Sequence, residues 1–278
     1  MTRPLTRFTH TVVAAGLALA LAACGDDGTA GPAGTSPRVT DPAATGTPAT
    51  GAATTTEPQV TTAASDPSAF CRAELEVETA ITNEADPSAA ISAAVAAAPP
   101  DVAPALDTVL AEFQANGGES EAFDEAYGEM VDWMKGNCGY GTIEATATEY
   151  AFAGIPEEVP AGPTIVSLTN VGKEFHELLL LRKNDGVTES FDELMAIEDE
   201  QETFAKTTVV GVAFAPNGAV GHAVSALSPG DYLAICFLPT GATPEVMAQM
   251  SGPDSSLPPG AGPPHFTHGM HFEFTVTD

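Results

Sequence analysis

The chain has 278 residues and is strongly acidic, with 9 basic against 38 acidic side chains and a formal net charge of −29. Nucleic acid is therefore excluded as an expected partner, because binding its phosphates requires clustered lysine and arginine. The acidic surface either favours basic partners and cations or simply keeps the protein soluble.

The first 23 residues have the composition of a secretion signal. Arg3 and Arg7 precede an uncharged run from Val12 to Ala23, which is too short to span a bilayer. The run ends in Leu21-Ala22-Ala23-Cys24, which resembles the lipobox of bacterial lipoproteins, where the cysteine thiol carries the lipid. We expect signal peptide 1–23 to be removed and a diacylated Cys24 to anchor the chain to the cell membrane, facing the extracytoplasmic side. The alternative is an ordinary signal peptide cleaved near Ala23.

Residues 24–65 consist almost entirely of Gly, Ala, Thr, Pro and Ser. A segment of this composition has too little apolar surface to offset the entropy lost on folding. We predict a disordered linker that begins at the lipidated cysteine and holds the folded part away from the membrane.

Helical signals begin at Asp66-Pro67-Ser68, where aspartate can cap a helix and proline can occupy its first position. The same signature recurs at Asp86-Pro87-Ser88, and Asn116-Gly117-Gly118 is a helix stop. Apolar residues recur between these signals at spacings of three and four residues. We therefore predict a small domain of three or four helices over residues 66–140, with its aromatic and methionine side chains in the core.

The chain has four cysteines, and an exported protein can form disulfides. If Cys24 is lipidated, three thiols remain and cannot all pair. Cys71 and Cys138 bracket the helical segment, so we predict a disulfide between them. Closing nearly the whole helical domain into one loop stabilises it by about 4 kcal/mol in the chain-entropy estimate. Cys236 is then left as a free thiol in a different domain.

From Gly141 onward the apolar period changes from helical to alternating, which is typical of β-strands. Seven short strands in residues 141–278 suggest an all-β, two-sheet Greek-key sandwich. One helix is predicted among them, because Ser190-Phe191-Asp192-Glu193 is a capping box. The predicted strands cover residues 142–152, 164–170, 176–182, 207–214, 219–226, 231–237 and 271–277.

The last third of the chain places soft and imidazole donors close together. Cys236 ends a predicted strand, and His265 and Met270 follow at either end of His-Phe-Thr-His-Gly-Met. Thiolate, thioether and imidazole donors suit copper, and two histidines, one cysteine and a weak axial methionine make the trigonal electron-transfer copper site. The missing histidine has to come from earlier in the chain, and His176 is the candidate.

Residues 142–278 resemble the cupredoxins, the type 1 blue-copper proteins such as plastocyanin and amicyanin. His176 follows an asparagine, Asn170, and a glycine-containing turn; Cys236 ends a tyrosine-containing strand before a proline; and His265 and Met270 fit the pattern His-x-x-x-Gly-Met. The resemblance implies a cupredoxin-like sandwich that holds one type 1 copper ion through His176, Cys236, His265 and Met270. It also implies that Asn170 ties the loop of His176 to the loop that carries Cys236.

The sequence departs from the family in the spacing of two ligands. The 25-residue segment Thr240–Pro264 separates Cys236 from His265, whereas the family has these ligands only a few residues apart. Loop-closure entropy grows slowly with length, so the insertion does not forbid the site. Met247 and Met250 in this insertion either cap the site as soft ligands or line the apolar side of a short helix.

Two further histidines, His268 and His271, follow His265 at intervals of three residues. In an extended chain, residues three apart face opposite ways, so both are expected to be bystanders. The alternative is that one of them replaces His265 at the metal, if the insertion shifts the loop.

The predicted protein is a lipid-anchored cupredoxin that carries single electrons to an unknown redox partner protein and is not an enzyme. Two alternatives keep the fold: a copper storage or delivery protein, and a copper-free binding or structural module. A multicopper oxidase is not expected, because the sequence contains neither the His-x-His nor the His-Cys-His pattern that those enzymes need.

Overall fold

The computed structural model describes residues 67–118, 120–197, 200–250 and 261–278. The predicted signal peptide, the lipidation site Cys24, the linker 24–65 and the predicted helix cap at Asp66 lie outside these residues. Among the helices in the described ranges, none combines the length and apolar composition needed to cross a membrane.

The first part of the described chain is helical. It contains α1 (Pro67–Thr82), α2 (Ser88–Ala97), α3 (Ala103–Asn116) and α4 (Glu121–Asn137). The helix ends are where the sequence signals place them: Asp86 accepts a hydrogen bond from the N–H of Ser88 at the start of α2, and α3 ends at Gly117 in the left-handed conformation. Ser120 caps α4 by accepting the N–H of Phe123.

The predicted disulfide is confirmed. Cys71 in α1 is bonded to Cys138, directly after α4, with the two Cα atoms 5.6 Å apart. The hydroxyl of Tyr140 donates to the carbonyl of Cys71 and ties the start of the first strand to the same helix. Among the described residues, Cys236 is the free cysteine, and it is buried.

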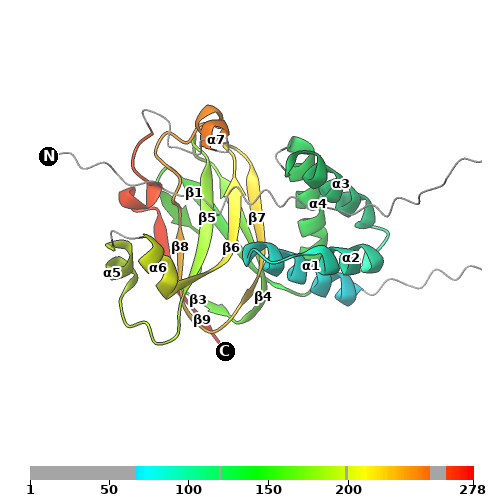
Figure 1. Cartoon of the computed structure of the whole chain (residues 1–278), viewed down its shortest axis with the longest axis horizontal. Coiled ribbons are helices and arrows are strands. Elements are labelled where there is room, and N and C mark those ends of the chain that lie inside the picture. The colour runs from blue at the N-terminus through cyan, green and yellow to red at the C-terminus, as the bar shows by residue number, and fades with distance from the viewer. Residues whose placement is uncertain (1–66, 119, 198–199, 251–260) are drawn as a thin grey trace, which may run out of the picture. The chain divides into compact units, whose positions relative to one another are not determined.

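Two mixed β-sheets follow the helices (Figure 1). One has the order β2-β1-β4-β7 and the other the order β3-β9-β8-β5-β6. The pairs β1–β4 and β3–β9 are parallel and the other pairs are antiparallel. The strands are β1 (Gly141–Thr148), β2 (Ala151–Ala153), β3 (Glu158–Pro160), β4 (Gly162–Asn170), β5 (His176–Lys183), β6 (Thr207–Ala215), β7 (Val220–Leu227), β8 (Gly230–Ile235) and β9 (His271–Thr277).

The predicted sandwich is therefore present, with two more strands than the sequence pattern indicates. The expected strand 142–152 is split into β1 and β2, because Tyr150 has a φ of 66° and reverses the chain between them. β2 and β3 have three residues each, too few for an alternating pattern to be recognised. The predicted capping box at Ser190 begins α5 (Phe191–Met195), and a second helix, α6 (Glu200–Lys206), was not predicted.

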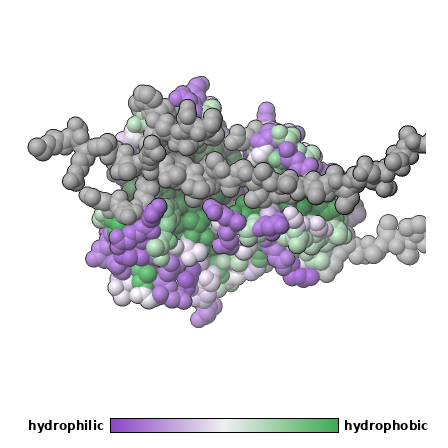
Figure 2. Space-filling model, viewed as in Figure 1, coloured by the Kyte–Doolittle hydropathy of each residue, from purple (hydrophilic) through white to green (hydrophobic). Residues whose placement is uncertain are grey.

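The sandwich core lies between the inner faces of the two sheets. Leu178 and Leu180 of β5 point into this core, while Leu179 and Leu181 point outward and pack with Phe191 of α5. The run of four leucines is thus buried on both faces because α5 covers one of them. Hydrophilic residues gather over the part of the sandwich that carries α5 and α6 on the face shown in Figure 2.

The outer face of the other sheet is covered by the helices. Ile165 of β4 and Val224 of β7 pack in one apolar cluster with Phe70, Val131 and Met134. The helical segment therefore buries apolar side chains of the sandwich, as well as its own.

Candidate metal centre

Three of the predicted ligands meet in one buried cluster at one end of the five-stranded sheet. His176 is the first residue of β5, Cys236 follows β8, and His265 begins the short 3-10 helix η1 (His265–His268) that leads into β9. Nδ1 of His265 lies 3.2 Å from Nδ1 of His176 and 3.3 Å from Sγ of Cys236. One donor atom from each residue lies within 4.8 Å of the other two. A single ion can bond all three, since Zn²⁺, for comparison, lies about 2.0–2.3 Å from nitrogen and sulfur donors.

The protonation states of the two histidines suit a cation. Burial, together with repulsion from a protonated His265, lowers the pKa of His176 to about 4. Burial also lowers the pKa of His265, against the opposing effect of the Glu174 carboxylate. Both rings are therefore neutral near pH 7 and can offer a nitrogen lone pair to a metal ion.

Cys236 needs a cation if it is to act as a thiolate. Burial raises the pKa of its thiol, and the nearby carboxylate of Glu177 raises it further. A bound metal ion supplies the positive charge that stabilises a buried thiolate. The N–H of Glu177 lies 3.5 Å from Sγ and favours the same charged form.

The two ends of the insertion 240–264 lie side by side at the end of β8. A β-bridge joins Pro239 to Pro264, and the N–H of Thr240 donates to the carbonyl of Pro263 over 2.9 Å. We call these contacts between residues 239–240 and 263–264 the neck of the insertion. Next to the neck, the N–H of His265 donates to the carbonyl of Leu238 over 2.8 Å. These bonds set His265 beside the end of β8 whatever the length of the loop beyond them.

The other two C-terminal histidines lie outside the cluster. His268 is exposed at the end of η1, and His271 begins β9, where it pairs with Ile235. The insertion therefore does not bring either of them into the place of His265.

Met270 lies beside the cluster. Its side chain is fully buried in the sandwich core together with Cys236, and the N–H of Cys236 donates to the carbonyl of Met270 over 3.2 Å. Gly269, with a φ of 102°, makes the left-handed turn that ends η1 and leads into Met270. Its role as the axial ligand remains a prediction.

The insertion contributes apolar packing. Met247 and Met250 lie on α7 (Pro244–Met250), and both are buried in the sandwich core. Of the two interpretations of these methionines, the structure has the one in which they line the apolar side of a short helix.

The comparisons can now be set beside this geometry. No family model matches the chain, and no curated protein sequence matches it. The solved structures that it resembles include blue-copper cupredoxins, a multicopper oxidase and a heme-copper terminal oxidase dimer. Auracyanin from the photosynthetic bacterium Roseiflexus castenholzii is 19% identical over 50% of this chain and 100% of its own, with a TM-score of 0.30.

Two further cupredoxins match about half of the chain. Auracyanin A, a "blue" copper protein from Chloroflexus aurantiacus, is 18% identical over 50% of this chain and 100% of its own, with a TM-score of 0.29. Reduced rusticyanin is 17% identical over 49% of this chain and 77% of its own, with a TM-score of 0.27. Similarity at these identities and TM-scores gives no evidence about function. The function proposed below therefore depends on the cluster of His176, Cys236 and His265.

The contacts of Asn170 correct one expectation drawn from the cupredoxin resemblance. Its Nδ2 donates to the carbonyls of Glu174 and Ala215, and its Oδ1 accepts the N–H of Gly172. Asn170 thus ties the loop before β5 to the end of β6, and among the described residues these bonds do not reach the loop that carries Cys236.

The link to the Cys236 loop comes from a residue that sequence reasoning missed. Oε1 of Glu177 accepts the N–H of Phe237, the residue after Cys236, over 2.8 Å. Burial raises the pKa of Glu177 to about 7. A carboxylate at the head of an otherwise apolar strand was the available signal.

Two more residues that the sequence did not single out enclose His265. Oε2 of Glu174 lies 2.9 Å from Nε2 of His265. The ring of Tyr150 meets His265 edge-on, with the centroids 5.2 Å apart, and also contacts the exposed ring of His268. The imidazole of His265 is therefore fully buried.

Proposed function

We propose that this protein binds one type 1 copper ion and carries single electrons outside the cytoplasm. The observation that carries the proposal is the convergence of two imidazole nitrogens and one thiol sulfur in a single buried cluster, with a buried thioether residue beside it. This donor set is the one that blue-copper electron-transfer sites use. His176, Cys236 and His265 would hold the ion, and Met270 would be the axial ligand.

A bound copper ion supplies a one-electron Cu(II)/Cu(I) couple. The chain's contribution is to keep the donors in fixed positions. β5 and β8 are hydrogen-bonded neighbours, with Leu179 opposite Ile235, so the sheet itself sets the spacing of His176 and Cys236. The neck of the insertion does the same for His265. Rigid donors reduce the rearrangement that accompanies each change of oxidation state.

The burial of the donors favours an electron carrier over an enzyme. His176, Cys236 and His265 all have 0% exposed surface, so a substrate cannot reach their donor atoms. An electron, in contrast, can pass through side chains that cover His265, such as Tyr150 and Glu174. The acceptor or donor would be a redox partner protein, which we leave unnamed.

We also propose that the mature chain is held on the outer side of the cell membrane by a lipid on Cys24. The support is the sequence Leu21-Ala22-Ala23-Cys24 after a short apolar run. Mass spectrometry of the membrane-associated protein should find the acyl groups on Cys24. A Cys24→Ser variant should appear in the soluble fraction, and its continued membrane association would contradict the anchor.

The copper proposal is tested by adding Cu(II) to the purified chain without its lipid. We expect one copper per chain and an intense visible band from thiolate-to-copper charge transfer. A colourless protein without stoichiometric copper would contradict the proposal and leave the copper-free binding module as the better account.

Copper storage or delivery is a second candidate, because Met247, Met250 and Met270 place three buried thioethers in the core that contains Cys236. Thioether sulfur is a soft ligand that prefers Cu(I). Under this alternative, the protein would bind copper only as Cu(I) and release it rapidly to a chelator. Stable binding of both oxidation states would exclude it.

A further inference from the structure

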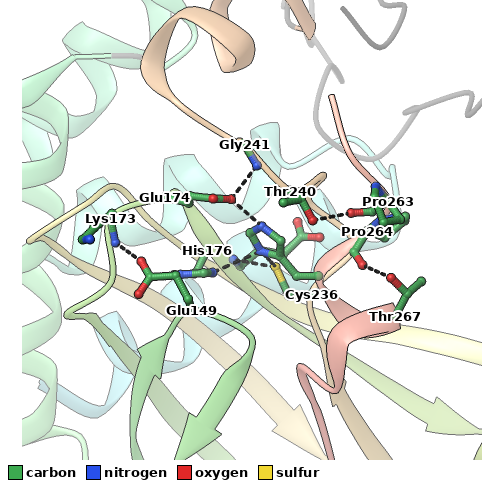
Figure 3. Close-up of polar contacts among 12 residues, drawn as sticks. Glu149, Lys173, Glu174, His176, Cys236, Thr240, Gly241, Pro263, Pro264 and Thr267 are labelled. Carbon is green, nitrogen blue, oxygen red and sulfur yellow. Dashed lines mark hydrogen bonds and ion pairs between the residues drawn. The ribbon is translucent and has the colours of Figure 1, made fainter. Parts of the chain in front are cut away.

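The side chain of Glu174 joins three segments at the metal centre. It lies in the loop before β5, two residues ahead of His176. One oxygen, Oε2, accepts two hydrogen bonds. One comes from Nε2 of His265 over 2.9 Å. The other comes from the N–H of Gly241 over 2.6 Å, and Figure 3 shows this contact. The loop of His176, the start of the insertion and the ligand His265 therefore meet at a single carboxylate oxygen.

The backbone around Glu174 is also fixed. Its carbonyl accepts from the side chain of Asn170 over 2.8 Å, and the N–H of Phe175 donates to the carbonyl of Ala242 over 2.8 Å. The backbone at Glu174 is therefore fixed by a hydrogen bond to its own carbonyl and by one from the next N–H. The side chain of Glu174 is only 18% exposed. A carboxylate fixed in this way can orient its partner.

The contact determines which nitrogen of His265 faces the cluster. When Nε2 carries the proton and donates it to Glu174, Nδ1 presents its lone pair toward Sγ of Cys236 and Nδ1 of His176. Tyr150 packs edge-on against the same ring and leaves it little room to turn over. A carboxylate on the far nitrogen of a metal-binding histidine fixes its tautomer and makes the ring a stronger donor.

We propose that Glu174 is a positioning residue for His265, and that its negative charge makes the centre favour Cu(II) over Cu(I). The first half depends only on the hydrogen bonds and ring contact described above, while the second rests on the proposed copper function. The charge argument is electrostatic: a carboxylate bonded to a ligand ring stabilises the ion of higher charge more than the ion of lower charge.

The positioning half is tested without metal, by NMR of the imidazole nitrogens. In the wild type, His265 should show the Nε2–H tautomer, with a ring proton protected from exchange with water. Glu174→Ala should remove that protection, and Glu174→Gln, which keeps an acceptor oxygen, should retain it. An Nδ1–H tautomer in the wild type, or unchanged protection in Glu174→Ala, would overturn the positioning role.

The electrostatic half is tested with copper bound, by the midpoint potential and the affinities for both ions. Glu174→Gln should shift the potential upward, and Glu174→Ala should weaken Cu(II) binding by about 10–100-fold with a smaller loss for Cu(I). The matched control is Glu149→Gln, because Glu149 accepts the N–H of Lys173 and acts on the histidines only through its charge.

The shift for Glu174→Gln should exceed that for Glu149→Gln, and equal shifts would contradict the role of the direct contact. If Glu174→Ala does not fold, the Gln variant alone decides the comparison. If the wild type takes up no copper, the proposed function and the Cu(II) preference fall together, while the NMR result still decides the positioning role.

Discussion

Sγ of Cys236 and Nδ1 of His265 lie 3.3 Å apart although the two residues are separated by 29 positions in the sequence. The neck at Pro239 and Pro264 explains this, because it returns the chain to its point of departure before His265 is reached. The number of residues beyond the neck then has no direct effect on the two donor atoms.

The methionines of the insertion should behave as core residues and not as ligands. Met250→Ala should lower the free energy of unfolding by about 2–5 kcal/mol, because it removes a buried side chain. The visible copper band should keep its position and intensity. Chemical denaturation measures the first effect and absorption spectroscopy the second. Loss of the band in a folded Met250→Ala protein would show that Met250 takes part in the site.

Met270 should tune the potential without being needed for binding. Met270→Leu conserves volume, so it should cost less than about 1.5 kcal/mol in stability. The charge-transfer band should remain, and the midpoint potential should rise, because an apolar group replaces a donor that stabilises Cu(II). Voltammetry of the two proteins makes the comparison. An unchanged potential would exclude Met270 as the axial ligand.

The disulfide should stabilise the helices and leave the metal centre unaffected. Replacing Cys71 and Cys138 together by serine should lower the free energy of unfolding by about 4 kcal/mol, since the bridge closes a loop of 67 positions. Copper stoichiometry should not change. A double variant as stable as the wild type would show that the bridge does not constrain the unfolded chain.

Stability should fall as the pH rises from about 4.5 to about 8, through Glu74 of α1. Burial raises the pKa of Glu74 from 4.5 to about 8, and repulsion from Glu78 acts in the same direction. The folded state therefore keeps a proton that the unfolded state has already released, so this contribution is fully present below pH 4.5 and is lost through pH 8.

Other titratable groups lie near Glu74, so the prediction is tested by replacing Glu74 alone. Glu78 accepts a hydrogen bond from the hydroxyl of Tyr127 in α4, and burial raises the pKa of Glu78 as well. The charge of Glu74 also contributes to raising the pKa of Tyr140. Glu74→Gln should flatten the pH profile by up to about 1.4 kcal/mol per pH unit and make the protein more stable than the wild type at pH 8. Parallel profiles for the two proteins would contradict the assignment.

Much of this architecture follows from local sequence. The alternation of β1, the capping box at Ser190 and the glycine stop after α3 each depend on neighbouring residues, and the structure has all of them. The order and local contexts of the candidate ligands, together with the cupredoxin resemblance, predicted the cluster of His176, Cys236 and His265.

The contacts around His265 could not be predicted in the same way. Glu174 and His265 are 91 positions apart, and their hydrogen bond exists only once β5 and the end of the insertion are side by side. A glutamate in a loop and a tyrosine in a turn carry no local signal that distinguishes them from exposed residues. Sequence thus predicts the donors, while the groups that hold and cover them depend on the folded chain.

The central claim is that Cys236 binds copper as a thiolate together with two histidines. The most direct measurement is the EPR spectrum of the protein loaded with one equivalent of Cu(II), recorded beside that of Cys236→Ser. The account predicts a narrow copper hyperfine splitting in the wild type and its loss in a folded Cys236→Ser variant. A wide splitting in the wild type, or identical spectra from the two proteins, would contradict it.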